Sequence, residues 1–259
     1  MNAAIWAEVL KARRSRLPWT TGIAFTIAAG FGGLVMFILQ DVGRARALGL
    51  LGTKAALTGG TADWPGYFAL LSQTVAVGGT LLFGLIVVWV FGREFSQDTA
   101  KDLLALPTPR AAIVGAKFGV TAVWCLLLSL YTYGLGLAIG AAIGLPGWSL
   151  PVAAGGLGKL LLTTVMTIAL VTPFALAASA RRGYLAGVAA MFAATFLAQV
   201  VALLGYGRFF PWSVPALFAG TAGAEGELPG PVGYALVVLV AILGTAGTIM
   251  WWNRADHDR

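Results

Sequence analysis

The amino-acid sequence predicts an all-α integral membrane protein with six transmembrane helices, an N-terminal interfacial helix and both termini in the cytoplasm. Of its 259 residues, 59% are hydrophobic and only 10% are charged, whereas a soluble domain has about 45–50% apolar and about 25% charged residues. Long charge-free stretches recur along the chain, and Lys and Arg gather in alternate gaps between them. This composition argues against a soluble enzyme, a disordered chain and a nucleic-acid-binding domain.

The net charge of +7 comes from 17 basic and 10 acidic residues. It fits a membrane protein, because such proteins collect Lys and Arg in loops on one side of the bilayer. The single cysteine, Cys125, lies in an apolar run, so we expect a buried thiol and a fold that needs no oxidising compartment. The single histidine, His257, lies outside the apolar stretches, which argues against haem, zinc-protease or Ser/His-protease chemistry at membrane depth.

Six charge-poor stretches are long enough to cross the hydrocarbon core, which takes about 20 helical residues. We expect one membrane domain, 1–259, with spans near 18–40, 67–91, 117–145, 159–180, 184–205 and 230–252. Another charge-free stretch contains Pro211 and Pro215 and is predicted not to span. Residues 206–229 are therefore expected to form an outer segment.

An even number of spans puts both termini on one side, and the distribution of basic residues selects that side. With the termini inside, the inner segments carry 12 basic residues, namely Lys11, Arg13, Arg14, Arg16, Arg93, Lys101, Arg110, Lys117, Arg181, Arg182, Arg254 and Arg259. The outer segments carry 5, namely Arg44, Arg46, Lys54, Lys159 and Arg208. This bias predicts cytoplasmic termini.

Residues 1–17 are predicted to form an amphipathic helix. One face carries Ile5, Trp6, Val9, Leu10 and Leu17, and the other carries Glu8, Lys11, Arg14 and Ser15. We interpret this as an interfacial helix with tryptophan at the headgroup level and basic residues facing anionic lipid. A cleaved signal peptide is the alternative, but the apolar run after Arg16 is longer than the usual 7–15 residues or so of a signal sequence.

The expected spans contain none of the acidic residues. Many ion-coupled transporters keep a carboxylate or histidine at mid-membrane, so secondary transport is disfavoured, although carbonyls and hydroxyls can also bind sodium. Residues 155–159, GGLGK, lack the first glycine and the final Ser or Thr of a phosphate-binding loop. We expect a flexible outer turn there, and energy for active transport would have to come from another chain.

Residues 92–116 are predicted to form a long cytoplasmic segment that contains a short amphipathic helix at 96–106. Leucines gather on one side of this helix and polar residues on the other, and Pro107 and Pro109 end it. From these residues alone, two interpretations remain open. The helix either docks into a groove on a partner or rests on the bilayer surface.

Three motifs resemble bacterial ABC exporter permeases of the second type. The first consists of Glu94, Asp98-Thr99, Lys101-x-Leu103-Leu104-x-Leu106-Pro107-x-x-Arg110 and Lys117, and it resembles the family signature between spans two and three, with one extra residue before the proline. The others are Glu8-x-x-Lys11-x-Arg13-Arg14-Ser15 and Phe210-Pro211-Trp212-x-x-Pro215. They resemble the N-terminal helix and the outer segment of the branch with bacitracin and lantibiotic self-protection exporters.

The resemblance implies a permease subunit of an ATP-driven exporter in the bacterial plasma membrane, which would move an amphipathic, drug-like or peptide-like substrate and could confer antibiotic resistance. It implies a second permease chain, identical or similar, and two ATPase subunits that bind ATP and Mg. This chain would hold no cofactor, would not itself be an enzyme and would not bind nucleic acid. The implied ATPase-coupling residues are Glu94, Gln97, Asp98, Thr99, Lys101, Asp102, Leu103, Leu104 and Arg110, with Arg181 and Arg182 in a second inner turn.

Two glutamines are candidates for an outer gate. Gln73 and Gln199 each lie six residues from the outer end of an expected span, a depth of about 9 Å at 1.5 Å per residue. The residues on their helical faces are Thr80, beside Gln73, and Phe192, Thr195 and Phe196, beside Gln199. The resembled family lines its pathway with spans two and five. The alternative is an ordinary interhelical hydrogen bond.

Two further patterns have a structural and a functional interpretation. Gly136, Gly140 and Gly144 are spaced for close helix packing or for a dimer seam. The threonines of the fourth expected span, Thr163, Thr164, Thr167 and Thr172, indicate a structural helix kinked at Pro173 or a substrate lining. For the whole chain, the alternatives to an exporter permease are a secondary transporter or channel without ATPases, and a membrane assembly factor.

Overall fold

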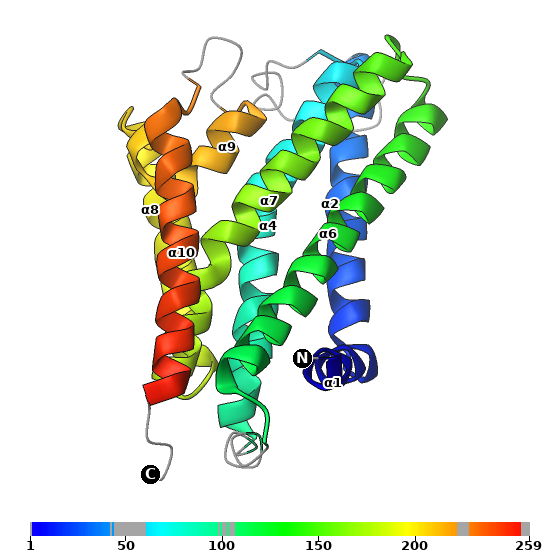
Figure 1. The fold of residues 1–259 in the computed structure, drawn as a ribbon. Helices are drawn as coiled ribbons and strands as arrows, with labels where there is room; N and C mark the ends of the chain where they lie inside the picture. The colour runs from blue at the N-terminus through cyan, green and yellow to red at the C-terminus, as the bar shows by residue number, and fades with distance from the viewer. Residues whose placement is uncertain are drawn as a thin grey trace.

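The computed structural model describes residues 2–41, 43, 61–97, 99, 103, 107–221 and 228–254, and its regular elements within these ranges are all helices (Figure 1). The long helices are α1 (Asn2–Arg14), α2 (Leu17–Gln40), α4 (Trp64–Ser96), α6 (Arg110–Ile143), α7 (Leu150–Ala180), α8 (Tyr184–Leu203) and α10 (Pro231–Arg254). Three short elements, η2 (Gly207–Phe209), η3 (Pro211–Ser213) and α9 (Val214–Ala219), connect α8 to α10. Six helices are long and apolar enough to cross a membrane, which confirms the predicted all-helical class and the number of spans.

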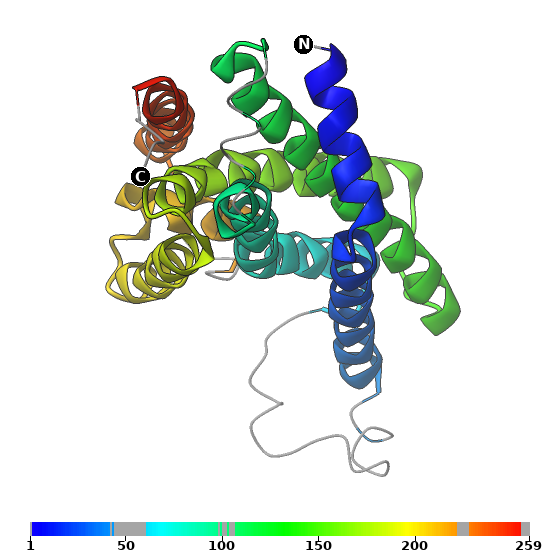
Figure 2. The same cartoon turned by 90° about the horizontal axis from the view of Figure 1, so that it is seen from below.

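The helix α1 and the last turn of α10 lie at the same end of the bundle, which we call the terminal end (Figure 1). The short helix α9 lies toward the opposite end. Figure 2 shows α1 running across the terminal end, whereas α2 runs along the bundle in Figure 1. This is the arrangement that an interfacial helix would need.

Helix α4 occupies the centre of the bundle. In its most apolar stretch, 67% of the residues are buried, against 22% in the corresponding stretches of α8 and α10. The side chains of Tyr67, Leu71, Phe83 and Phe91 on α4 are all fully buried. Helices α8 and α10 therefore leave most of their apolar surface for lipid or for another chain.

The turn between α6 and α7 lies earlier than expected. Gly144 ends α6 with a left-handed φ of 74°, and Ser149 caps α7 by accepting a hydrogen bond from the Val152 N–H at 3.3 Å. Helix α7 therefore begins at Leu150 instead of near 159, and the predicted flexible turn at 155–159 is wrong. Gly156 lies inside the helix, where an added Cβ would stand 2.5 Å from the ring of Phe68.

The glycines of α6 pack within the chain. An added Cβ on Gly140 would stand 2.6 Å from the ring of Trp64, and one on Gly136 would collide with Leu71. Both neighbours belong to α4. These two glycines therefore serve close packing between α6 and α4 and not a dimer seam, and Gly144 forms the cap of the helix.

Pro173 lies inside α7, and the backbone carbonyls near it accept hydrogen bonds from neighbouring side chains. Proline has no N–H to donate to the carbonyl four residues earlier, and the Thr172 hydroxyl donates to that carbonyl, Ala169 O, at 2.8 Å. The next carbonyl, Leu170 O, accepts a hydrogen bond from Trp212 Nε1 at 3.1 Å. Thr164 and Thr167, both buried, donate to carbonyls of their own helix, which agrees with the structural interpretation.

A close crossing of α7 and α10 leads to a stability prediction. An added Cβ on Gly244 would stand 2.7 Å from the backbone nitrogen of Pro173 and would collide with Thr172 Oγ1. Gly244→Ala should therefore destabilise the protein by about 1–3 kcal/mol, as overpacking does. Thermal unfolding in detergent measures the change. Gly158→Ala in α7 is the matched control, since nothing lies within 4 Å of its Cβ position, and an equal loss in both variants would contradict the crossing.

Candidate functional site

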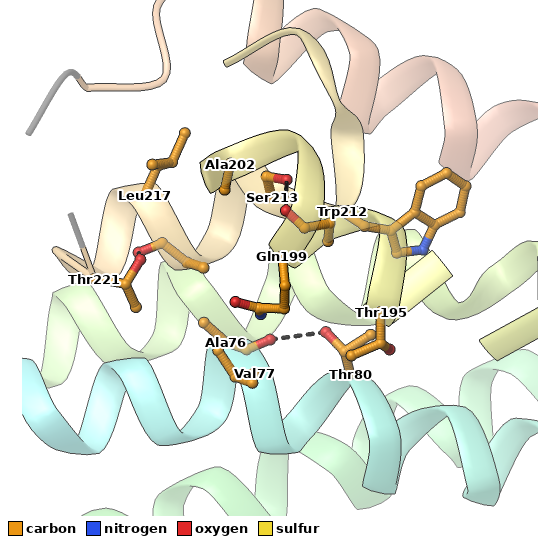
Figure 3. A pocket seen from close by; sticks show the side chains of 12 residues that line it. Ala76, Val77, Thr80, Thr195, Gln199, Ala202, Trp212, Ser213, Leu217 and Thr221 are labelled. Carbon is orange, nitrogen blue, oxygen red and sulfur yellow. Dashed lines mark hydrogen bonds between the residues drawn. The ribbon is translucent and has the colours of Figure 1, made fainter. Parts of the chain in front are cut away.

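A small polar cavity lies near the end of the bundle opposite the termini (Figure 3). Its walls come from α4, α8 and the connecting segment 212–221. It is lined by Ala76, Val77, Thr80, Thr195, Ala198, Gln199, Ala202, Trp212, Ser213, Ala216, Leu217 and Thr221. Its volume is about 40 Å³, enough for a few water molecules but well below the roughly 300–1,000 Å³ of a drug-sized site. The cavity is therefore closed to a large substrate in this conformation.

The cavity brings together three of the predicted gate residues, Thr80, Thr195 and Gln199. The two threonine hydroxyls donate to carbonyls of their own helices. Thr80 donates to Ala76 O at 2.7 Å (Figure 3), and Thr195 donates to Met191 O at 2.9 Å. In Figure 3 the amide of Gln199 points toward α4. The side chain of Gln199 remains exposed at the edge of the cavity.

Phe192 and Phe196 do not line this cavity. Their exposed fractions are 57% and 68%, because they lie on a part of α8 that is turned away from Ala198 and Ala202. In this conformation they lie outside the cavity, and their place in a gate beside Gln199 stays a prediction. They form an aromatic surface on the outside of the bundle.

Gln73 forms a hydrogen bond with the segment that connects α8 to α10. Its Nε2 donates to the carbonyl of Gly220 at 3.0 Å, and Gly220 ends α9 with a left-handed φ of 92°. Among the described residues of this one chain, no hydrogen bond joins Gln73 to Gln199, and their part in an outer gate stays a prediction. Gln73 instead ties the end of α9 to α4.

The connecting segment is anchored to two other helices. Trp212 Nε1 donates to Leu170 O at the kink of α7, and Ser213 Oγ donates to Ala198 O of α8 at 2.9 Å. Together with the bond from Gln73, these contacts hold 212–220 over the cavity. Sequence reasoning did not place Trp212 or Ser213 in the site, although the Phe210-Pro211-Trp212 motif was a signal for this segment.

A second cluster, at the terminal end, consists of four charged residues, Glu8, Lys11, Glu94 and Lys117. Glu94 Oε1 accepts hydrogen bonds from Lys11 Nζ and Lys117 Nζ, both at 2.8 Å. Glu8 lies 3.1 Å from each lysine. Two cations and two carboxylates thus compensate each other, and the fully buried Lys117 links α1, α4 and α6. We call these four residues the charge cluster.

Glu94 is buried within this cluster and lies inside α4, a candidate membrane span. The span predicted at 67–91 ends before Glu94, and α4 continues past it to Ser96. The charge of Glu94 in this last part of the helix is compensated by the two lysines. Thr99 Oγ1 donates to Glu94 Oε2 at 2.7 Å, which attaches the following loop to the cluster. Glu94 therefore holds Thr99 by a hydrogen bond. Because it is buried, it has little surface for direct contact with another subunit.

The charge cluster also acts on Lys11. Burial lowers the pKa of Lys11, but its hydrogen bond to Glu94 and the charges of Glu8 and Glu94 outweigh burial, so the pKa lies above the usual 10.5. Lys11 is therefore charged at neutral pH, and the stability that its raised pKa adds is lost only as pH rises through that pKa.

The other predicted coupling residues have varied surroundings. Arg110 donates to the carbonyls of Trp252 and Asn253, at 3.1 and 3.3 Å, and so caps the end of α10. Gln97 accepts a hydrogen bond from Arg93, and Leu103 packs against the core. Arg181 and Arg182 are exposed in the α7–α8 turn. The remaining four, Asp98, Lys101, Asp102 and Leu104, lie outside the described residues.

Among the residues that the structure describes, His, Cys, Asp and Glu form no group of three or more that could hold a metal ion. Cys125 is fully buried, as expected. The two sites of interest are therefore the small cavity against the middle of α4 and the charge cluster near the C-terminal end of α4.

Comparison with known proteins gives two matches. The model of a family described as "ABC-2 family transporter protein" matches residues 4–199. A bacitracin transport permease protein of Bacillus licheniformis is 26% identical to the chain over 179 residues, which are 69% of this chain and 85% of that protein. The family match includes the charge cluster and the α4 and α8 walls of the cavity.

Proposed function

Because the chain belongs to the ABC-2 family of transporter membrane proteins, we propose that it forms the translocation path of an ATP-driven exporter. As an ABC-2 permease with six apolar helices, it is a multi-pass protein of a bacterial plasma membrane. A second permease chain, identical in the simplest case, would complete the path. Two separate ATPase subunits would bind ATP and Mg and supply the energy.

The proposed substrate is an amphipathic, drug-like or peptide-like compound. The relative from Bacillus licheniformis, described as a bacitracin transport permease, supports a substrate of this class and a role in antibiotic resistance. The aromatic, threonine and glutamine side chains around α8 suit a molecule with both apolar and hydrogen-bonding groups.

The structural observation that supports this proposal is the exposed side chain of Gln199 on α8, at the edge of the cavity. A polar side chain on the lipid-facing surface of a span is costly unless it faces water or another polar group. The exposed Phe192 and Phe196 extend the same surface. A second permease chain, or a water-filled path between two chains, would give the amide a partner.

The proposed coupling surface lies at the terminal end, which we assign to the cytoplasm because basic residues gather there. The exposed turn at Arg181 and Arg182 and the loop that follows α4 would contact the ATPases. The charge cluster would connect this loop to α1, α4 and α6, so that movement of the loop is passed to three helices together.

Transport in reconstituted vesicles tests the proposal. The chain and its ATPase subunits are placed in proteoliposomes, and uptake of a fluorescent amphipathic peptide is measured in inside-out vesicles with ATP and without it. An exporter requires ATP and an intact ATPase subunit. Equal uptake without ATP, driven by an ion gradient, would support a secondary transporter instead.

The coupling surface gives a separate prediction. Arg181→Glu should weaken ATPase association by about tenfold, because reversing a charge at an interface places like charges together. Arg208→Glu is the matched control, with the same charge change on an exposed arginine at the opposite end. Co-purification and coupled ATP hydrolysis measure both variants. If the two variants bind equally well, the ATPase does not dock at the α7–α8 turn.

A further inference from the structure

A basic groove separates α1 from the end of α4 at the terminal end. Its α1 side is formed by Lys11, Arg14 and Ser15, and its α4 side by Trp89, Arg93 and Gln97. Its volume is about 360 Å³, which lies within the roughly 300–1,000 Å³ range of small-molecule sites. The groove is therefore large enough for a compact polar headgroup, unlike the closed cavity at the other end.

The described residues that line this groove carry an excess of positive charge. Lys11 belongs to the charge cluster, where two lysines face two carboxylates. Arg14 and Arg93 add two positive charges, and the lining residues that the structure describes include no carboxylate. An anion would therefore gain two cationic partners on entering it.

Arg93 is held in a fixed orientation. Its Nε donates to Gln97 Oε1 at 2.9 Å, and its guanidinium carbon lies 5.0 Å from the centre of the Trp89 ring. These contacts leave its terminal NH₂ groups to donate. A guanidinium that is preorganised in this way suits bidentate recognition of a phosphate.

The surroundings place the groove at the level of lipid headgroups. Trp6 on the outer face of α1 and Trp19 at the start of α2 have exposed fractions of 68% and 77%, and tryptophan is enriched at membrane–water interfaces. Leu10 and Trp89 add apolar surface to the groove. A lipid could thus contact the arginines with its phosphate and these side chains with its glycerol and upper acyl groups.

We propose that the groove between α1 and α4 binds the phosphate of an anionic phospholipid headgroup, with Arg14 and Arg93 as its cationic partners. Bound lipid would fasten α1 to α4 from the bilayer side, next to the charge cluster that joins them inside the protein. This inference does not depend on the transport cycle or on the substrate.

Lipid-dependent stability of the purified full chain tests the site. After delipidation in detergent, the thermal midpoint is measured while phosphatidylglycerol, phosphatidylcholine or inorganic phosphate is added, and bound lipid is counted by native mass spectrometry. We expect phosphatidylglycerol to raise the midpoint most. The double variant Arg14→Gln/Arg93→Gln should bind it about 30-fold more weakly, the loss expected for two cationic contacts at a membrane surface.

The matched control is Arg13→Gln/Arg16→Gln, which removes the same charge from exposed side chains outside the groove lining and should bind phosphatidylglycerol like the parent. If the Arg93 change impairs folding, Arg14→Gln alone serves as the test. Arg14 is exposed, so this variant should fold, and it should still bind the lipid more weakly because Arg14 lines the groove. Equal weakening in groove and control variants would overturn the site in favour of diffuse attraction. Equal stabilisation by inorganic phosphate or phosphatidylcholine would overturn the assignment to an anionic lipid.

Discussion

Replacing Glu94 by glutamine should lower the free energy of unfolding by about 3–5 kcal/mol, the usual cost of removing one partner from a buried ion pair. Glu94 accepts one hydrogen bond from each lysine of the charge cluster and one from Thr99. Without its charge, the buried Lys117 would share the single carboxylate of Glu8 with Lys11. Two lysines would then face one carboxylate, and one of them, Lys117, is fully buried.

Thermal and denaturant unfolding in detergent measure the effect, with tryptophan fluorescence as the signal. Glu8→Gln is the first comparison and should cost less, because Glu8 accepts from the lysines at 3.1 Å whereas Glu94 accepts at 2.8 Å. The double variant Glu94→Gln/Lys117→Met removes one charge of each sign and should recover part of the loss, since a balanced removal leaves no unpaired buried charge. A Glu94→Gln protein as stable as the parent would show that the cluster contributes nothing to the fold.

The same cluster explains a limit of sequence reasoning. Charge-free stretches located all six helices that are long and apolar enough to cross a membrane, because a helix needs an uncharged run of about 20 residues to cross lipid. The charge-free stretch of the second span ends before Arg93 and Glu94, however, whereas α4 continues to Ser96. The compensating lysines come from α1 and α6, so their proximity to Glu94 arises from packing and cannot be inferred from the local pattern.

The start of α7 shows a similar limit. Three glycines at 155–158 predicted a turn, since glycine lowers helix stability by about 1 kcal/mol. The cap at Ser149 and packing of α7 on Phe68 outweigh that preference. Here a tertiary contact that needs the small residue decides the conformation, and composition alone could not reveal it.

In the cavity, sequence analysis identified the polar side chains but not their partners. Thr80, Thr195 and Gln199 share one lining because their helical positions put them on facing sides of α4 and α8. Gln73, by contrast, binds a backbone carbonyl in α9. Every residue has a carbonyl, so the sequence contains no signal for this partner, and the irregular segment 207–220 has no periodicity from which its position could be predicted.

The bond between Gln73 and Gly220 leads to the last prediction, that Gln73→Leu loosens the cover over the cavity. An interhelical hydrogen bond in a membrane protein contributes about 0.6–2 kcal/mol, so its loss should raise the open population about 3–30-fold. Leucine keeps roughly the same volume, so the change removes the bond without opening a void. In the assembled transporter we expect altered basal ATP hydrolysis with normal expression.

Cysteine labelling measures the opening directly. Ala76 lines the cavity and is buried, so Ala76→Cys places a reporter thiol there. The native Cys125 is fully buried and should add little labelling of its own. When opening is fast relative to labelling, the maleimide rate follows the open population and should rise about 3–30-fold on adding Gln73→Leu. Thr74→Val is the matched control, because the Thr74 hydroxyl donates to Leu70 O within α4 and does not hold α9. If Gln73→Leu and Thr74→Val label at the same rate, then Gln73 does not hold the cover closed, and the anchors at Trp212 and Ser213 suffice.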